Sequence, residues 1–177
     1  SGFLPYIWGH AFGGIWQEIQ LRATGNRILT DIYTRGSPDG KVTITATASS
    51  PGSFRLIIFN PNGDLVRTKT YTRRSQVKST FTLSDPQPWS LSDPRLYTVH
   101  LSLPEGDQIS DETTLRFGLR SFNAQGNTLL LNGQPIYPRL ILSWGWYSDR
   151  LDTNPGGERV HSDLQRLKEM GYNGVKL

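Results

Sequence analysis

One stretch divides this sequence into two parts: TLRFGLRSFNAQGNTLLLNGQPIYPRLIL, residues Thr114–Leu142. Before it the sequence predicts short β-strands, and after it a loop, a helix and the start of one further strand. Within it, Asn132-Gly133 lies between two apolar runs, and this dipeptide accepts the positive φ that both central positions of a type I′ turn require. The stretch therefore predicts a tight hairpin at a domain boundary, with Tyr137–Leu142 completing a small β-cap.

Residues 25–117 predict a complete domain. Turn signals rich in Gly, Pro, Asn and Asp separate short apolar runs, at spacings typical of an immunoglobulin-like β-sandwich of about seven strands. Every second residue from Val42 to Ala48 and from Tyr97 to Leu103 is apolar, so each of these strands has one buried face. The predicted fold class is all-β. The expected strands are Ile28–Thr34, Lys41–Ala48, Phe54–Asn60, Leu65–Thr72, Val77–Leu83, Leu96–Leu103 and Gln108–Phe117.

The composition excludes several classes of function. The 177 residues carry a formal net charge of +4, but the basic residues are scattered and Arg73-Arg74 is the one adjacent basic pair. Nucleic-acid binding usually needs a basic stripe or a recognisable module. No apolar run approaches the length of a membrane span. We therefore expect no nucleic-acid partner and no membrane partner.

The sequence contains no cysteine, which excludes disulfides, cysteine-based zinc sites and a thiol nucleophile. His161 has no second ligand at metal spacing, so we expect it to be solvated rather than metal-bound. Neither a metal nor a cofactor is therefore expected. The first residues lack the pattern of a signal peptide, and a sequence from which a signal had been removed would look the same. The compartment stays open.

Trp89 and Tyr97 belong to the segment PWSLSDPRLY (Pro88–Tyr97). In the structural interpretation, Trp89 covers one end of the core and Tyr97 bonds its hydroxyl to nearby backbone, as in a tyrosine corner. In the alternative interpretation, Trp89 stacks on a sugar. A lone tryptophan beside proline more often packs than binds, which favours the structural interpretation.

The loop SWGWYSDRLDTNPG (residues 143–156) carries the candidate ligand contacts. Trp144, Trp146 and Tyr147 lie too close in sequence for all three to enter one compact core, and Asp149 adds a carboxylate. Rings that stack on C–H faces, beside carboxylates that accept from hydroxyls, are typical of a carbohydrate contact. Packing between domains would explain the same aromatic residues equally well.

Residues 157–170 predict a helix. The helix begins near Gly157 or at a capping box formed by Ser162 and Gln165. Gly171 follows it at the position that a left-handed C-cap favours. The apolar residues recur at helical spacing and form one stripe; they are Val160, Leu164, Leu167 and Met170.

At the other end of the chain, the alternation in Ile15–Leu21 predicts one strand. A single strand must pair with another element to be stable. Its partner is either the sandwich or a domain on the N-terminal side.

Four motifs, in the same order, resemble glycoside hydrolase family 2, the group of β-galactosidases, β-glucuronidases and β-mannosidases. GGIWQEIQL (Gly13–Leu21) is similar to the last strand of the family's N-terminal sugar-binding jelly roll, and PWSLSDPRLY is similar to the signature of its immunoglobulin-like middle domain. FGLRSF with LLLNGQPIYPR (Phe117–Arg139) resembles the segment that leads into the catalytic barrel. DLQRLKEMGYNGVKL (Asp163–Leu177) resembles the helix and first strand of that (β/α)₈ barrel.

The resemblance implies a domain organisation. Residues 1–24 would hold the last strand of the jelly roll, residues 25–117 the immunoglobulin-like sandwich, and residues 118–177 the connecting hairpin with the start of a truncated barrel. The sequence departs from the family pattern at Leu140, at Lys176 and in the SWGWYSD loop. These departures leave the sugar and the linkage open.

The resemblance also implies retaining hydrolysis of β-glycosides by two carboxylates about 5–5.5 Å apart. In the family these are glutamates on later barrel strands, one of them in an Asn-Glu pair, and this sequence has no such pair. We therefore assign no catalytic residue. The residues expected to face the mouth of the barrel and bind substrate are Trp144, Trp146, Tyr147, Asp149 and Lys176.

Two hypotheses follow. In the first, the chain is an accessory region of a β-glycosidase, inactive alone, whose partners are the neighbouring domains of the same chain and a carbohydrate bound through the missing barrel. In the second, it is a free-standing carbohydrate-binding or adhesion module. The C-terminal helix and strand argue against the second, because a binding module has no use for the opening of a barrel. Homo-oligomerisation stays open.

Overall fold

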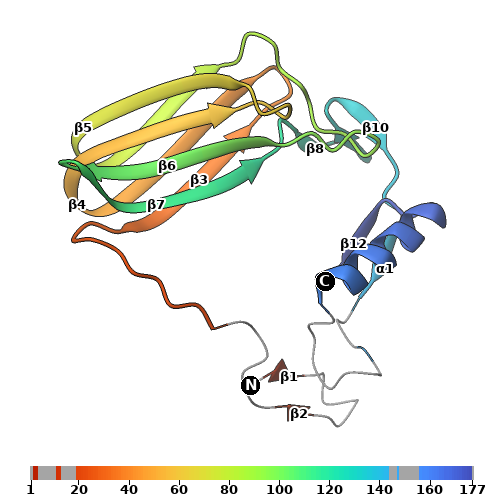
Figure 1. Ribbon diagram of the computed structural model, residues 1–177. Coiled ribbons are helices and arrows are strands. Elements are labelled where there is room, and N and C mark those ends of the chain that lie inside the picture. The colour runs from red at the N-terminus through yellow and green to blue at the C-terminus, as the bar shows by residue number, and fades with distance from the viewer. Residues whose placement is uncertain (1, 4–10, 13–18, 144–146, 148–155, 177) are drawn as a thin grey trace. The chain divides into compact units, whose positions relative to one another are not determined.

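The computed structural model describes residues 2–3, 11–12, 19–143, 147 and 156–176 (Figure 1). The chain divides into two compact units, one formed by Arg22–Ile136 and the other by Ser1–Leu21 together with Tyr137–Leu177. Among the described residues, no helix combines the length and the apolar character that a membrane crossing requires.

Within the described residues, five strands form the sandwich: β3 (Leu29–Gly36), β4 (Lys41–Phe59), β5 (Leu65–Thr82), β6 (Tyr97–Glu105) and β7 (Gln108–Phe117). They belong to one curled antiparallel sheet in the order β3-β4-β6-β7, with β5 paired to β4 (Figure 1). β4 and β5 have 19 and 18 residues, about three times the usual strand length. Each of them therefore covers two of the strands expected from the sequence.

The two long strands pass from one layer of the sandwich to the other. Residues 42–47 of β4 pair with β3 and with residues 76–81 of β5, whereas residues 55–58 pair with β6 and with residues 67–70 of β5. Register shifts beside Gly52 and a φ of 56° at Arg73 mark the bends, because a bulge lets a strand turn sharply. The prediction of an immunoglobulin-like all-β sandwich is confirmed: β3, β6, β7 and two halves each of β4 and β5 make its seven segments.

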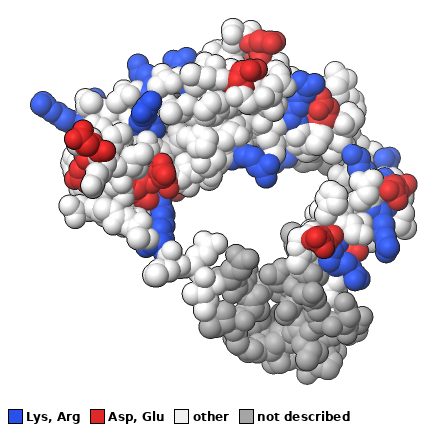
Figure 2. All heavy atoms as spheres, in the orientation of Figure 1, with Lys and Arg blue, Asp and Glu red and all other residues white. Residues whose placement is uncertain are grey.

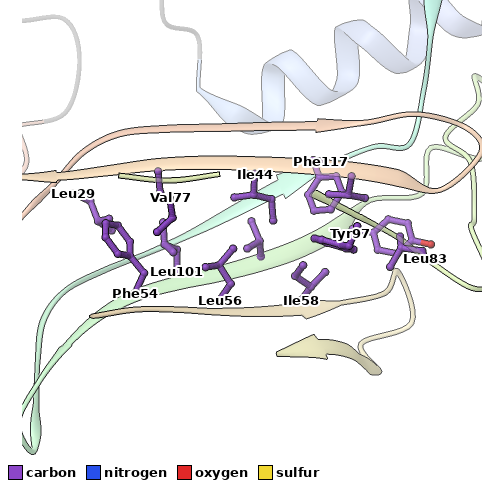
Figure 3. Close-up of a cluster of buried hydrophobic side chains, with 14 of the residues drawn as sticks. Leu29, Ile44, Phe54, Leu56, Ile58, Val77, Leu83, Tyr97, Leu101 and Phe117 are labelled. Atoms are coloured by element: carbon purple, nitrogen blue, oxygen red, sulfur yellow. The ribbon is translucent and has the colours of Figure 1, made fainter. Parts of the chain in front are cut away.

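The core lies between the two layers. Figure 3 shows side chains from β4, β5, β6 and β7 pointing toward one another in this space. Alternate residues are buried along β6, along both halves of β4 and along the last part of β5, as the period of two along a strand requires. The apolar faces predicted for Val42–Ala48 and Tyr97–Leu103 are confirmed, since Val42, Ile44, Ala46, Leu101 and Leu103 are at most 1% exposed.

Buried polar groups attach the segment before β3 to β7. Asp111 is buried; one of its carboxylate oxygens accepts from the backbone N–H of Leu29 at 2.7 Å, and the other accepts from Arg22. The hydroxyl of Ser110 accepts from the N–H of Arg27 at 2.8 Å and donates to its carbonyl at 2.9 Å. Side chains thus replace the strand ladder here and satisfy backbone groups that burial would otherwise leave unpaired.

Tyr97 is 1% exposed, and its ring stacks on Phe117 with centroids 5.6 Å apart. Its hydroxyl accepts from the backbone N–H of Gln87 at 2.9 Å. The structural interpretation of Tyr97, a hydroxyl tied to nearby backbone, is confirmed.

Replacing Tyr97 with phenylalanine is expected to lower the free energy of unfolding by about 1 kcal/mol, because the N–H of Gln87 loses its acceptor while the ring packing is kept. Urea denaturation measures this loss. Tyr33, which is 57% exposed, supplies the matched control, and Tyr33→Phe should leave the urea midpoint unchanged. Equal midpoints for both variants would show that the hydroxyl of Tyr97 does not contribute.

A three-stranded antiparallel sheet follows the sandwich: β8 (Phe122–Gln125), β9 (Thr128–Leu131) and β10 (Gln134–Ile136). Asn132 and Gly133 join β9 to β10 with φ values of 52° and 78°, as a type I′ turn requires. The predicted hairpin is confirmed. Tyr137–Leu142 does not complete this sheet as a β-cap, and that prediction is wrong.

Instead, β11 (Leu140–Leu142) pairs in parallel with β12 (Gly174–Lys176), and α1 (Gly157–Glu169) lies between them in sequence. This is a β-α-β unit (Figure 1). The resemblance identified the C-terminal strand as the first of a parallel series, but β11 precedes it in the same sheet. Parallel strands need a crossover of a dozen or more residues, which explains why β11 finds its partner 34 residues along the chain rather than in the adjacent hairpin.

The start of α1 matches the prediction that the helix begins near Gly157. The helix begins at Gly157 and has no side-chain cap, so the capping box of Ser162 and Gln165 is wrong. Arg166 and Lys168 occupy the last turn, and Gly171 has a φ of 87°, as a left-handed C-cap requires.

The N-terminal strand prediction falls mainly on residues that the structure does not describe. Of Ile15–Leu21, residues 19–21 are described and lie outside any strand, with Ile19 and Leu21 exposed. The described N-terminal strands are β1 (Gly2–Phe3) and β2 (Ala11–Phe12), which pair with each other.

Candidate functional site

The carboxyl ends of β11 and β12 meet at one edge of the parallel pair. Ser143 follows β11 directly, and its N–H donates to the carbonyl of Lys176 at 2.9 Å. The Lys176 side chain is exposed at the end of β12. Ligands of parallel α/β units bind beyond the carboxyl ends of the strands. This edge is therefore the candidate site, and the predicted ligand loop starts from it.

Tyr147 is the described residue of that loop's aromatic cluster. It is half-buried, and the guanidinium of Arg159 from α1 lies 5.6 Å from the centroid of its ring. A groove of about 470 Å³ is lined by the end of β11, by Ser143 and Tyr147, and by residues of α1. Asp163 is the one carboxylate among the described residues that line it, and Asp163 pairs with Arg159 at 3.3 Å.

The structure describes two of the five residues predicted to bind substrate. Tyr147 lines the groove, and Lys176 lies at the carboxyl end of β12 but is not among the described lining residues. Trp144, Trp146 and Asp149 lie outside the described residues.

The opposite end of the β-α-β unit has a polar clamp that sequence reasoning missed. The side-chain oxygen of Asn173 accepts from the N–H of Arg139 at 2.7 Å, its amide nitrogen donates to the carbonyl of Tyr137 at 2.9 Å, and its N–H donates to the carbonyl of Arg139. Arg139 in turn donates to the carbonyl of Gly171. Asn173 therefore fixes where β11 and β12 begin. The one sequence signal was an Asn-Gly pair before an apolar run, which is typical of any turn.

Trp89 has a structural position. Its Cβ and ring pack on Gly118, where an added Cβ would lie 3.0 Å from the Cβ of Trp89. The guanidinium of Arg120 lies 5.0 Å from the centroid of its ring. Its carbonyl accepts from the side chain of Asn132 at 2.8 Å. The side chain of Trp89 therefore packs at the end of the sandwich, and its backbone carbonyl is bonded to the hairpin turn.

Asp39 has a carboxyl group whose pKa is displaced by its hydrogen bonds. Catalytic groups usually have displaced pKa values. The hydroxyl of Ser37 and the backbone N–H of Lys41 donate to Asp39 and lower the pKa of its carboxyl group. Asp39 lies in the exposed turn between β3 and β4, so this shift reflects turn geometry. Among the described residues, no group of three or more His, Asp or Glu side chains could hold a metal ion.

The chain is similar to known glycosidases. It is 26% identical to a β-galactosidase of Leuconostoc mesenteroides over 148 residues and 25% identical to a β-galactosidase of an Arthrobacter species over 170 residues. These matches cover 80% and 92% of this chain but only 14% and 15% of the relatives. The chain therefore spans about a seventh of the length of these curated relatives.

A solved structure confirms the fold. The β-glucuronidase of Ruminococcus gnavus in complex with D-glucuronic acid superposes with a TM-score of 0.72 and 16% identity, covering 85% of this chain and 26% of that protein. The family model of the glycosyl hydrolases of family 2 matches residues 27–120. This range includes all five strands of the sandwich and more than half of the 177 residues. By this match the chain belongs to glycosyl hydrolase family 2.

Proposed function

We propose that this chain is the accessory region and barrel entrance of a retaining β-glycosidase. Residues 1–24 end a jelly roll, residues 25–117 form the immunoglobulin-like domain, and residues 118–177 lead into the barrel. The sandwich and hairpin then hold the barrel in place, and the catalytic carboxylates lie on later barrel strands.

The β-α-β unit that follows the hairpin is the observation that carries this proposal. A parallel pair with one crossover helix is the repeating element of a (β/α)₈ barrel, and it has no role in a free-standing sandwich. In this unit the apolar stripe of α1 lacks cover: Val160, Leu164 and Met170 are 38%, 48% and 72% exposed. Neighbouring elements of a barrel would bury such a stripe. β11 and β12 are then its first two strands.

In this proposal the carboxyl edge of β11 and β12 becomes one wall of the substrate mouth. Trp144, Trp146, Tyr147, Asp149 and Lys176 face the sugar from this wall. The aromatic rings would stack on the sugar, and Asp149 and Lys176 would bond its hydroxyls. The β-galactosidases among the relatives favour a neutral hexose as the substrate class.

The gene beyond Leu177 tests the organisation directly. About 250 residues with alternating strands and helices and one Asn-Glu pair should follow. A stop codon shortly after Leu177 would contradict the proposal and would favour a binding module.

Residues 1–177 alone are expected to release no nitrophenol from aryl β-galactosides or aryl β-glucuronides above the rate in buffer, because retaining hydrolysis needs two carboxylates about 5–5.5 Å apart. The assay compares the purified chain with heat-denatured chain, and a commercial β-galactosidase shows that the substrate is intact. Hydrolysis that co-purifies with the chain and disappears on heating would overturn the assignment of catalysis to later strands.

A further inference from the structure

A groove on the sandwich is lined by arginines from three places in the sequence. It has a volume of about 360 Å³ and lies beside Arg35 of β3, Arg116 of β7 and Arg120 after β7. Trp89, Leu96 and Phe117 supply its apolar wall. No Asp or Glu is among the described residues that line it. Elsewhere on the visible face of this unit, basic and acidic side chains are interspersed (Figure 2).

Two of these arginines have no partner in the described part of the chain. Arg35 and Arg116 are exposed, and their side chains make no hydrogen bond, ion pair or ring contact there. Arg95, beside the neighbouring groove that Arg116 also lines, differs: it donates to Asp93 and to Gln87, both at 2.6 Å. The arginine groove therefore gathers positive charge that the described residues do not neutralise, whereas the adjacent arginine is satisfied.

The third arginine is held in place. The guanidinium of Arg120 lies 5.0 Å from the centroid of the Trp89 ring, which fixes a planar cation beside the groove at little further cost in side-chain entropy. The backbone N–H of Arg120 donates to Gly36 at 3.1 Å, and that of Trp89 donates to Leu119 at 3.0 Å. Because both of these backbone N–H groups are already bonded, Arg120 and Trp89 offer no strand edge with which an extended peptide could pair.

We propose that this groove binds an oxyanion group, sulfate or carboxylate, either free or carried on a sugar. A guanidinium group can donate two parallel hydrogen bonds to two oxygens of such a group. The volume is at the lower end of small-molecule sites, so one sugar ring with its charged substituent fits, and Trp89 and Leu96 offer it an apolar wall. All described residues that line this groove belong to the unit Arg22–Ile136, and binding there does not depend on glycosidase activity.

Titration of the ¹⁵N-labelled chain 1–177 with three probes tests the proposal: sodium sulfate, glucose 6-sulfate and glucose, at constant ionic strength. The side-chain N–H signal of Trp89 reports on the groove. We expect both sulfated probes, but not glucose, to shift this signal in a saturable way. Tighter binding of glucose 6-sulfate than of sulfate identifies a sugar-borne oxyanion, and equal binding identifies a free one. A response to glucose as strong as that to glucose 6-sulfate would overturn the proposal.

The double variant Arg35→Gln/Arg116→Gln should weaken sulfate binding by about tenfold or more, because two charge-assisted contacts are lost. The matched control is Arg55→Gln/Arg74→Gln, which removes the same charge from two exposed arginines outside the groove lining. We expect it to change the affinity less than twofold. Equal weakening by both variants would show general charge attraction rather than a site, and unchanged affinity in both would also overturn the proposal.

Discussion

The Asp111→Ala variant is expected to have a free energy of unfolding about 3 kcal/mol lower than that of the parent chain. The carboxylate of Asp111 is 3% exposed; it accepts from the N–H of Leu29 at 2.7 Å and from the N–H of Glu112 at 2.9 Å, and it pairs with Arg22. Alanine leaves buried donors unpaired, and each such donor costs about 1–3 kcal/mol. The ion pair with Arg22 adds little to this loss, because the Arg22 side chain is 54% exposed to solvent.

Urea denaturation followed by tryptophan fluorescence measures the change. Asp111→Asn keeps an acceptor for the N–H of Leu29 and loses the charge, so it should cost about half as much. Asp107, in the exposed turn between β6 and β7, supplies the control, and Asp107→Ala should leave the midpoint within about 0.5 kcal/mol of the parent. If Asp107→Ala and Asp111→Ala were equally stable, Asp111 would not be what anchors the segment before β3.

The Asn132→Ala variant is expected to lower the free energy of opening the hairpin by about 3 kcal/mol. Asn132 has a φ of 52°, its side-chain oxygen accepts from the N–H of Ser121 at 2.9 Å, and its amide donates to the carbonyl of Trp89 at 2.8 Å. Alanine loses both hydrogen bonds, at about 1 kcal/mol each. It also takes up the left-handed conformation, which costs about 1–2 kcal/mol for a residue other than glycine.

Amide hydrogen exchange separates these two contributions. Asn132→Gly keeps the backbone conformation and loses the side chain, so the amides of β9 should exchange faster than in the parent and more slowly than in Asn132→Ala. The amides of β6, in the core of the sandwich, serve as an internal reference and should change little. Equal exchange in the glycine and alanine variants would show that the backbone conformation of Asn132 carries no cost.

The positions of the strands could be predicted because each apolar run has a period of two and ends at a turn signal. Tyr97–Leu103 shows this best, since every predicted inward residue is buried. The continuity of β4 and β5 could not be predicted. Pro51-Gly52 has the composition of a turn, but here it forms a bulge within one strand, because the backbone at Gly52 passes so close to Arg27 that an added Cβ would lie 2.3 Å from its guanidinium carbon.

The parallel pairing of β11 could not be predicted either. Leu140–Leu142 is a run of three residues, too short to distinguish a last hairpin strand from a first parallel strand. Its partner is defined by Asn173, whose hydrogen bonds reach back to Tyr137 and Arg139. Contacts over such separations leave no local pattern in the sequence.

The candidate site was predicted by residue type and is only partly placed. Tyr147 lies beside α1 and against Arg159, a contact that the composition of the loop did not predict. The arginine groove was not predicted, because Arg35 is far in sequence from Arg116 and Arg120, and each of the three resembles an ordinary surface residue in sequence. Likewise, the turn at Asn132 was predictable from two letters, but its bond to Trp89, 43 residues away, was not.

The passage of β4 and β5 between the layers has a mechanical consequence. In a sandwich of separate strands, the two sheets are held together mainly by apolar contact and can shear past one another. Here two covalent backbones cross from sheet to sheet, so tension applied to either layer is carried directly into the other. Sliding of one layer past the other must therefore bend these two strands.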